Sequence, residues 1–163
     1  MDRIVIVGTD TAAGSAIANR LTGRFDVSGF WFRSPIGPSE CPTSRIDPAR
    51  LAEQIELADT VYFCGGASQS SWDTGFGNFA TEEKWLKACV ELSANAGTGF
   101  IYVSSDAVFN GPWVFHDDEC VCESQSEVAA ELLEFESRVN AHPDHLIVRT
   151  NIVSVKSGQN SFA

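Results

Sequence analysis

Short apolar runs alternate with amphipathic stretches along this chain of 163 residues, and the alternation predicts an α/β fold. The strand-like runs are continuously apolar, as in parallel strands that are buried on both faces. A turn of small residues follows the first run, and helix-spaced segments separate the others. We therefore expect one domain over 1–163, a doubly wound, mainly parallel sheet in three α/β/α layers, of Rossmann-like type.

The first half of the chain is expected to hold two strands and two helices. The β-branched run at 4–7 predicts a buried strand, and the spacing of Ile17 and Leu21 predicts a helix over 15–21. An apolar run at 27–32 predicts the second strand, and a Pro/Ser/Gly-rich segment predicts a loop over 34–44. Asp47 and Pro48 suit the N-cap and first position of a helix that ends near 57.

Three more strands and two long helices are expected in the second half. Strands are predicted at 60–64, 100–104 and 145–149. A Gly/Ser-rich loop over 65–79 precedes a helix over 81–94, and an irregular segment over 106–122 precedes a helix over 123–139. In this last helix Glu123, Glu127 and Glu131 are four residues apart, which predicts one solvated acidic face.

Composition excludes several classes of partner. The formal net charge is -11, from 22 acidic and 11 basic residues, which argues against nucleic acid and anionic membranes. The sequence predicts neither a transmembrane helix nor a signal peptide, and we expect a cytoplasmic protein.

Five cysteines, an odd number, predict no disulfide framework. Cys120 and Cys122 lack zinc-site spacing, so no metal site is predicted.

The turn after the first strand is the main candidate for ligand binding. It places Gly8, Thr11, Ala13 and Gly14 between a strand and a helix N-terminus, where small residues let a pyrophosphate approach the backbone. Thr11 either donates a hydrogen bond to a phosphate or blocks the cradle. Asp10 disfavours an anionic ligand unless its side chain points away. The alternative interpretation is a tight turn without a ligand.

Residues that directly follow the other strands are further candidates, because ligands of such sheets bind at the carboxyl ends of the strands. The cofactor candidates are Arg33, Ser34, Gly65, Gly66, Ala67 and Ser104. An arginine after the second strand suits a 2′-phosphate, so Arg33 favours NADP over NAD. The alternative is a solvated arginine.

The segment FIYVSSDAVFNG at 100–111 resembles the motif Ser-Thr-Asp-Tyr-Val-Phe-Asp-Gly of the dTDP-4-dehydrorhamnose reductases, in the extended short-chain dehydrogenase family. The segments HLIVRTN at 145–151 and GQNSF at 158–162 resemble later motifs of that family. The resemblance implies an NAD(P)-binding Rossmann part and a substrate contact at Ser105. It also implies an adenine contact at Asp47, although we favour the N-cap interpretation.

Two departures from the family weaken the expectation of catalysis. The family's Tyr-x-x-x-Lys pair protonates the substrate carbonyl and holds the nicotinamide ribose. Here the tyrosines are Tyr62 and Tyr102, neither followed by lysine four residues on, and the family positions fall at Val128 and Leu132. Family members also continue for about as long again, and that substrate half is absent here.

The sequence thus favours a catalytically degenerate Rossmann protein that binds NADP or NAD and acts as a regulatory or interaction module. One alternative is an NADPH-dependent reductase of a keto-sugar nucleotide with another proton donor, such as His116. Another is a ligand-free domain that binds a protein partner. Aromatic residues of the two long loops and of the helix over 81–94 either pack in the core or anchor an interface, and in the second case we expect a homodimer; these are Trp72, Phe76, Phe79, Trp85, Trp113 and Phe115.

Overall fold

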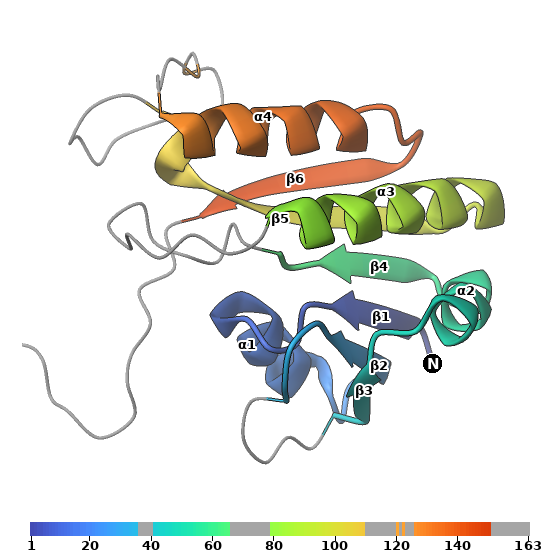
Figure 1. The fold of residues 1–163 in the computed structure, drawn as a ribbon. Helices are drawn as coiled ribbons and strands as arrows, with labels where there is room; N and C mark the ends of the chain where they lie inside the picture. Colours follow the sequence, from blue (N-terminus) through green and yellow to red (C-terminus); the bar gives the residue numbers. More distant parts are fainter. Residues whose placement is uncertain (36–40, 66–78, 110–119, 121, 123–125, 151–163) are drawn as a thin grey trace, which may run out of the picture.

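The computed structural model describes residues 1–35, 41–65, 79–109, 120, 122 and 126–150. In these residues the sheet has six parallel strands in the order β3-β2-β1-β4-β5-β6 (Figure 1). The strands are β1 (Arg3–Val7), β2 (Asp26–Trp31), β3 (Thr43–Arg45), β4 (Thr60–Phe63), β5 (Gly99–Ser105) and β6 (His145–Thr150). The helices are α1 (Ala12–Leu21), α2 (Pro48–Glu56), α3 (Phe79–Ala96) and α4 (Glu127–Val139), with a 3₁₀ turn, η2 (Asp106–Val108).

The strand order confirms the doubly wound Rossmann-like fold. The chain runs outward from β1 to β3 and then crosses to β4 on the other side of β1, so the direction switches between β1 and β4. All strands are parallel, and their carboxyl ends meet at one edge of the sheet, toward which the arrowheads in Figure 1 point. A ligand is expected at this edge, next to the switch point.

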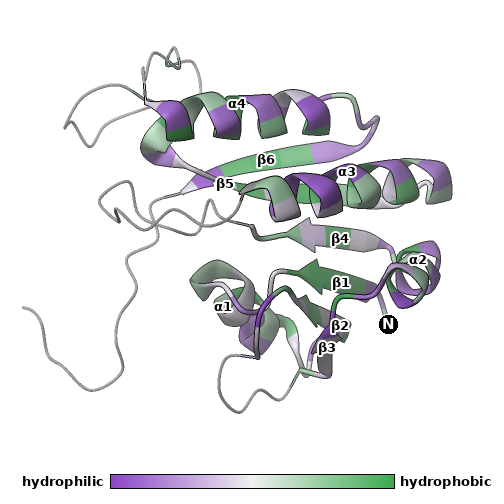
Figure 2. Ribbon diagram, in the orientation of Figure 1, coloured by the Kyte–Doolittle hydropathy of each residue, from purple (hydrophilic) through white to green (hydrophobic). Residues whose placement is uncertain are grey.

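The two larger of three apolar clusters lie on opposite faces of the sheet. On one face, residues of α2, α3 and α4 such as Leu51, Leu86 and Phe135 pack on the strands. On the other face, Ala13 and Ala18 of α1 pack against β1, β2 and β4. Figure 2 shows most of β1 as hydrophobic, whereas α4 alternates between hydrophilic and hydrophobic residues, as a helix on the surface of a core does.

The outer strand β6 is less well covered than the rest of the sheet. Leu146 and Val148 are 54% and 39% exposed. They are two residues apart and so share one face of the strand. In the described part of the chain β6 pairs with β5 alone.

Some boundaries differ from the sequence prediction. The segment predicted as a loop over 34–44 leads into a short strand, β3, which pairs with β2 through Gly29 and Thr43. Helix α1 begins at Ala12 rather than at 15, because Thr11 caps it. Helix α4 begins at Glu127, with Ser126 as N-cap; residues 123–125 lie outside the described part. No helix among the described residues is long and apolar enough to cross a membrane.

Candidate functional site

The connection between β1 and α1 is so tight that glycine is required both in the turn, at Gly8, and in the first turn of α1, at Gly14. Gly8 has a φ of +91°, and a Cβ there would lie 2.0 Å from the carbonyl oxygen of Cys64. At Gly14 a Cβ would lie 2.1 Å from the carbonyl oxygen of Gly8. Both distances are far below a van der Waals contact, so the two glycines set how closely α1 approaches the ends of β1 and β4.

Thr11 uses its hydroxyl within the turn. The hydroxyl donates to the carbonyl oxygens of Gly8 (2.8 Å) and Cys64 (3.1 Å) and accepts from the amide of Gly14 (3.1 Å). It is therefore the N-cap of α1, and its proton is already directed at backbone carbonyls. The amides of Ala12 and Ala13 come next, and as the first amides of the helix they have no intrahelical acceptor.

Asp10 points away from the head of α1, toward the end of β2. Its carboxylate accepts hydrogen bonds from the amides of Phe32 (3.0 Å) and Arg33 (2.8 Å). In return the amides of Gly8 and Thr9 donate to the carbonyl oxygen of Phe30, at 2.8 and 2.9 Å. These four hydrogen bonds fix the turn against β2 and place the Asp10 charge at the end of that strand.

The remaining cofactor candidates differ in their accessibility. Arg33 and Ser34 are exposed after β2. Gly65 is buried after β4, and a Cβ there would lie 2.9 Å from an oxygen of Glu82. Gly66 and Ala67 lie outside the described residues. Asp47 accepts from the amides of Ala49 (3.1 Å) and Arg50 (3.0 Å), which confirms the predicted N-cap.

Ser104 belongs to a buried polar cluster that the sequence did not predict. Its hydroxyl donates to Glu136 (2.6 Å), whose carboxylate also accepts from Nε (3.0 Å) and Nη2 (2.7 Å) of Arg149. Ser104 is 0% and Glu136 3% exposed, so this cluster joins β5, β6 and α4 inside the protein. The predicted cofactor residue Ser104 is thus turned toward α4.

Glu136 belongs to the helix for which one solvated acidic face was predicted, made of Glu123, Glu127 and Glu131. Glu127 and Glu131 are exposed as predicted, Glu123 lies outside the described residues, and Glu136 is on the buried face. The signal in the sequence was the spacing of Leu132 and Glu136, four residues apart on one helix face, together with Arg149 at the end of the last strand.

The two positions that the resemblance assigns to the family's catalytic pair, Val128 and Leu132, hold apolar side chains; that assignment stays a prediction. Val128 and Leu132 share one face of α4 and pack with Val108 and Phe109 of the segment after β5. Leu132 is 1% exposed, so a lysine there would bury an ammonium group among apolar side chains. The burial of Tyr102 raises its pKa, further from the range of a useful proton donor.

Ser105, the predicted substrate contact, caps the turn η2. Its hydroxyl accepts from the amide of Ala107 (3.2 Å) and donates to the carboxylate of Asp106 (3.3 Å). The side chain is 2% exposed. In this arrangement Ser105 holds the backbone after β5, and its hydroxyl proton is directed toward its neighbour.

Several predicted features lie outside the described residues, namely His116, Trp72, Phe76, Trp113 and Phe115. Phe79 begins α3, and the partly buried Trp85 packs against the core. Each cysteine carries a thiol rather than a disulfide. Among the described residues no group of three or more His, Cys, Asp or Glu side chains is arranged to hold a metal ion.

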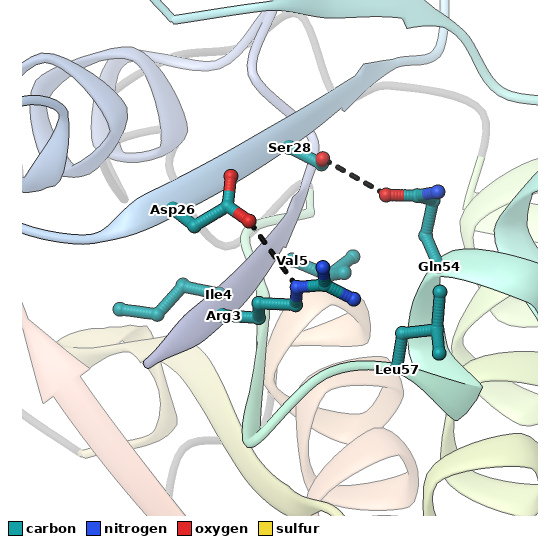
Figure 3. A pocket seen from close by; sticks show the side chains of 7 residues that line it. All are labelled: Arg3, Ile4, Val5, Asp26, Ser28, Gln54 and Leu57. Carbon is teal, nitrogen blue, oxygen red and sulfur yellow. Dashed lines mark hydrogen bonds and ion pairs between the residues drawn. The ribbon is translucent and has the colours of Figure 1, made fainter. Parts of the chain in front are cut away.

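A small cavity of about 180 Å³ lies at the amino ends of β1 and β2, whereas the candidate site lies at their carboxyl ends (Figure 3). Arg3 and Asp26 form an ion pair there (3.2 Å), and Ser28 donates to Gln54 (3.0 Å). Ile4, Val5 and Leu57 complete its lining. This volume is below the roughly 300–1,000 Å³ of typical ligand pockets, and the cavity is remote from the carboxyl ends of the strands.

Comparisons with solved structures identify the same fold in known enzymes. A protein from Methylobacillus flagellatus assigned to the NAD-dependent epimerases/dehydratases is 22% identical, with a TM-score of 0.70. A protein from Sulfolobus tokodaii assigned as a dTDP-4-dehydrorhamnose reductase is 18% identical, with a TM-score of 0.68. The UDP-glucuronic acid 4-epimerase of Bacillus cereus, solved with NAD, is 16% identical, with a TM-score of 0.69. The chain therefore shares the fold of these epimerase, dehydratase and reductase structures.

The likeness covers nearly all of this chain but only part of each neighbour. It extends over 91, 90 and 90% of this chain and over 53, 55 and 56% of those structures, so the chain spans about half their length. No protein-family model and no curated protein matches the sequence. The family resemblance noted in the motif at 100–111 thus agrees with the structural neighbours, whose low identities carry the fold and no activity.

Proposed function

We propose that this chain binds a nicotinamide dinucleotide at the β1–α1 turn, lacks the family's proton-transfer chemistry, and acts as a regulatory or interaction module. The observation that carries the proposal is a contrast within one fold. Gly8 and Gly14 keep the tight β1–α1 connection, whereas the chain has no Tyr-x-x-x-Lys pair, and the positions that we assign to that pair on α4 hold Val128 and Leu132.

In this proposal the pyrophosphate binds at the N-terminus of α1. The amides of Ala12 and Ala13 have no intrahelical acceptor, and the helix dipole adds positive potential there. Because Gly8 and Gly14 have no side chain, a pyrophosphate can come close to the backbone amides at the N-terminus of α1. The structures solved with NAD from Bacillus cereus and Agrobacterium tumefaciens support a dinucleotide as the ligand of this fold.

Hydride transfer alone does not complete a carbonyl reduction. A bound NAD(P)H supplies the hydride, but a proton donor must stand beside the carbonyl oxygen. Val128 cannot donate, and the Ser105 hydroxyl is directed at Asp106. We therefore expect binding without turnover of keto-sugar nucleotides, with a partner protein as the target of the bound state.

The test is a titration with NADH and NADPH, read by cofactor fluorescence and melting temperature. Ligand at 100 times its Kd stabilises a fold by about 2.7 kcal/mol. For a chain of this size that corresponds to a rise of roughly 5–10 °C. No shift with either dinucleotide at millimolar concentration would refute the binding site, and steady oxidation of NADPH with a keto-sugar nucleotide would refute the loss of catalysis.

Two alanine-to-aspartate variants locate the site. Ala12→Asp adds a carboxylate to the first turn of α1, where it suits the helix dipole but repels a pyrophosphate. Ala16→Asp adds the same charge one turn later, at an exposed position. We expect Ala12→Asp to weaken binding at least tenfold and Ala16→Asp to leave it within about twofold, since the dipole and ligand contacts fall off within one turn. Equal effects would move the site elsewhere.

A further inference from the structure

The end of β2 normally decides which dinucleotide this fold accepts. An acidic side chain there hydrogen-bonds the free ribose 2′-hydroxyl of NAD, whereas an arginine accommodates the 2′-phosphate of NADP. In this chain the residues that follow the strand are Phe32, Arg33 and Ser34, none of them acidic. By sequence position alone, Arg33 therefore favours NADP.

A carboxylate is nevertheless present at the end of β2, because Asp10 of the turn after β1 reaches it. Asp10 accepts from the amides of Phe32 (3.0 Å) and Arg33 (2.8 Å), so its charge lies against the backbone where the strand ends. The hydrogen bonds from Gly8 and Thr9 to the carbonyl oxygen of Phe30 hold the turn in that position. The amides of Phe32 and Arg33 could otherwise donate hydrogen bonds to an anionic ligand, but here they already donate to the carboxylate of Asp10.

Arg33 does not neutralise this charge through its side chain. It is exposed, and among the described residues no ion pair joins its guanidinium to Asp10. Its amide, by contrast, is hydrogen-bonded to Asp10. A 2′-phosphate placed here would meet a fixed carboxylate at short range in partly buried surroundings, where like charges repel strongly.

We propose that Asp10 is the specificity-determining residue of the nucleotide site and that it selects NAD over NADP. The inference rests on the proposed dinucleotide function. The Asp10 carboxylate accepts from the ribose hydroxyls of NAD, and it excludes the 2′-phosphate by charge and by occupying the amides of Phe32 and Arg33. Arg33 contributes its backbone to this arrangement, which reverses the preference read from its side chain.

The experiment measures dissociation constants of NAD⁺ and NADP⁺ by isothermal titration calorimetry, with the pair 5′-ADP and 2′,5′-ADP as probes of the 2′-phosphate alone. We expect the unmodified chain to bind NAD⁺ at least tenfold more tightly than NADP⁺, and 5′-ADP more tightly than 2′,5′-ADP. Asp10→Asn removes the charge at nearly constant shape and is expected to lower the NAD⁺ to NADP⁺ preference by about tenfold or more.

Asp59→Asn is the matched control. Asp59 also accepts a hydrogen bond from a backbone amide, that of Arg3 (2.8 Å), but at the other edge of the sheet. Its substitution should leave the preference unchanged. Equal or tighter binding of NADP⁺ by the unmodified chain overturns the inference without any variant, and so does an Asp10→Asn variant that weakens both dinucleotides by the same factor. Absence of all binding instead refutes the nucleotide site itself.

Discussion

Removing the Glu136 carboxylate should destabilise the fold far more than removing any exposed carboxylate of α4. Glu136 accepts from Ser104 and twice from Arg149, and its side chain is 4% exposed. Removing one partner of a buried pair costs about 3–5 kcal/mol. The Arg149 side chain is 28% exposed and regains some hydration, so we take about 3 kcal/mol for Glu136→Ala, the low end of that range.

This cost corresponds to a fall in melting temperature of roughly 6–12 °C for a chain of this size. The control is Glu134→Ala, which removes an exposed ion pair with Arg138 (2.7 Å), worth about 0.5 kcal/mol. Chemical denaturation of both variants, of Arg149→Met alone, and of each glutamate variant combined with Arg149→Met gives the coupling between positions 136 and 149. Equal costs for the two glutamates, or additive effects of Glu136→Ala and Arg149→Met, would show that the cluster contributes no more than a surface pair.

Two further perturbations follow from the same structure. Gly8→Ala would place a Cβ 2.0 Å from the carbonyl oxygen of Cys64, at a residue whose φ is +91°. We therefore expect chemical denaturation to show a free energy of unfolding lower by about 2–4 kcal/mol. A loss below about 1 kcal/mol would contradict the tight turn. His142 is 2% exposed, and its burial lowers its pKa below that of an unperturbed histidine. Protonation of this side chain therefore favours the unfolded chain, and the free energy of unfolding should fall as the pH drops below about 6.5. The fall in melting temperature from pH 7.5 to pH 5.5 should be smaller in His142→Gln, and an unchanged fall would assign it to other groups.

The sequence predicted the fold because its strands carry their own signal. Runs rich in apolar residues marked β1, β2, β4, β5 and β6, and in the central strands β1, β4 and β5 this reflects burial on both faces of the sheet. The strand β3 has the sequence Thr43-Ser44-Arg45 and is polar, short and at the edge of the sheet. Its pairing with β2 depends on tertiary contacts, which no local pattern of three residues expresses.

At the candidate site the sequence predicted the strand–turn–helix connection but not the directions of its polar side chains. Sequence placed Gly8 and Gly14 correctly in a tight turn, because steric demands on glycine are local. It could not show that Asp10 turns toward β2 or that Glu136 turns inward to Arg149, since both depend on partners that are distant along the chain. The assignment of Val128 and Leu132 to the catalytic positions is consistent with their shared face on α4 but remains a prediction.

The outer edge of β6 bears on the behaviour of the protein in solution. Open strand edges tend to pair with one another, and charged residues commonly prevent this. Here Leu146 and Val148 are exposed, while the guanidinium of Arg149 is bound to Glu136. Among the described residues β6 pairs with β5 alone, and repulsion between copies that each carry a formal charge of -11 opposes association at its outer edge. Because that repulsion is screened over about 10 Å at 0.1 M salt, ionic strength should control how readily this sheet extends from one copy into the next.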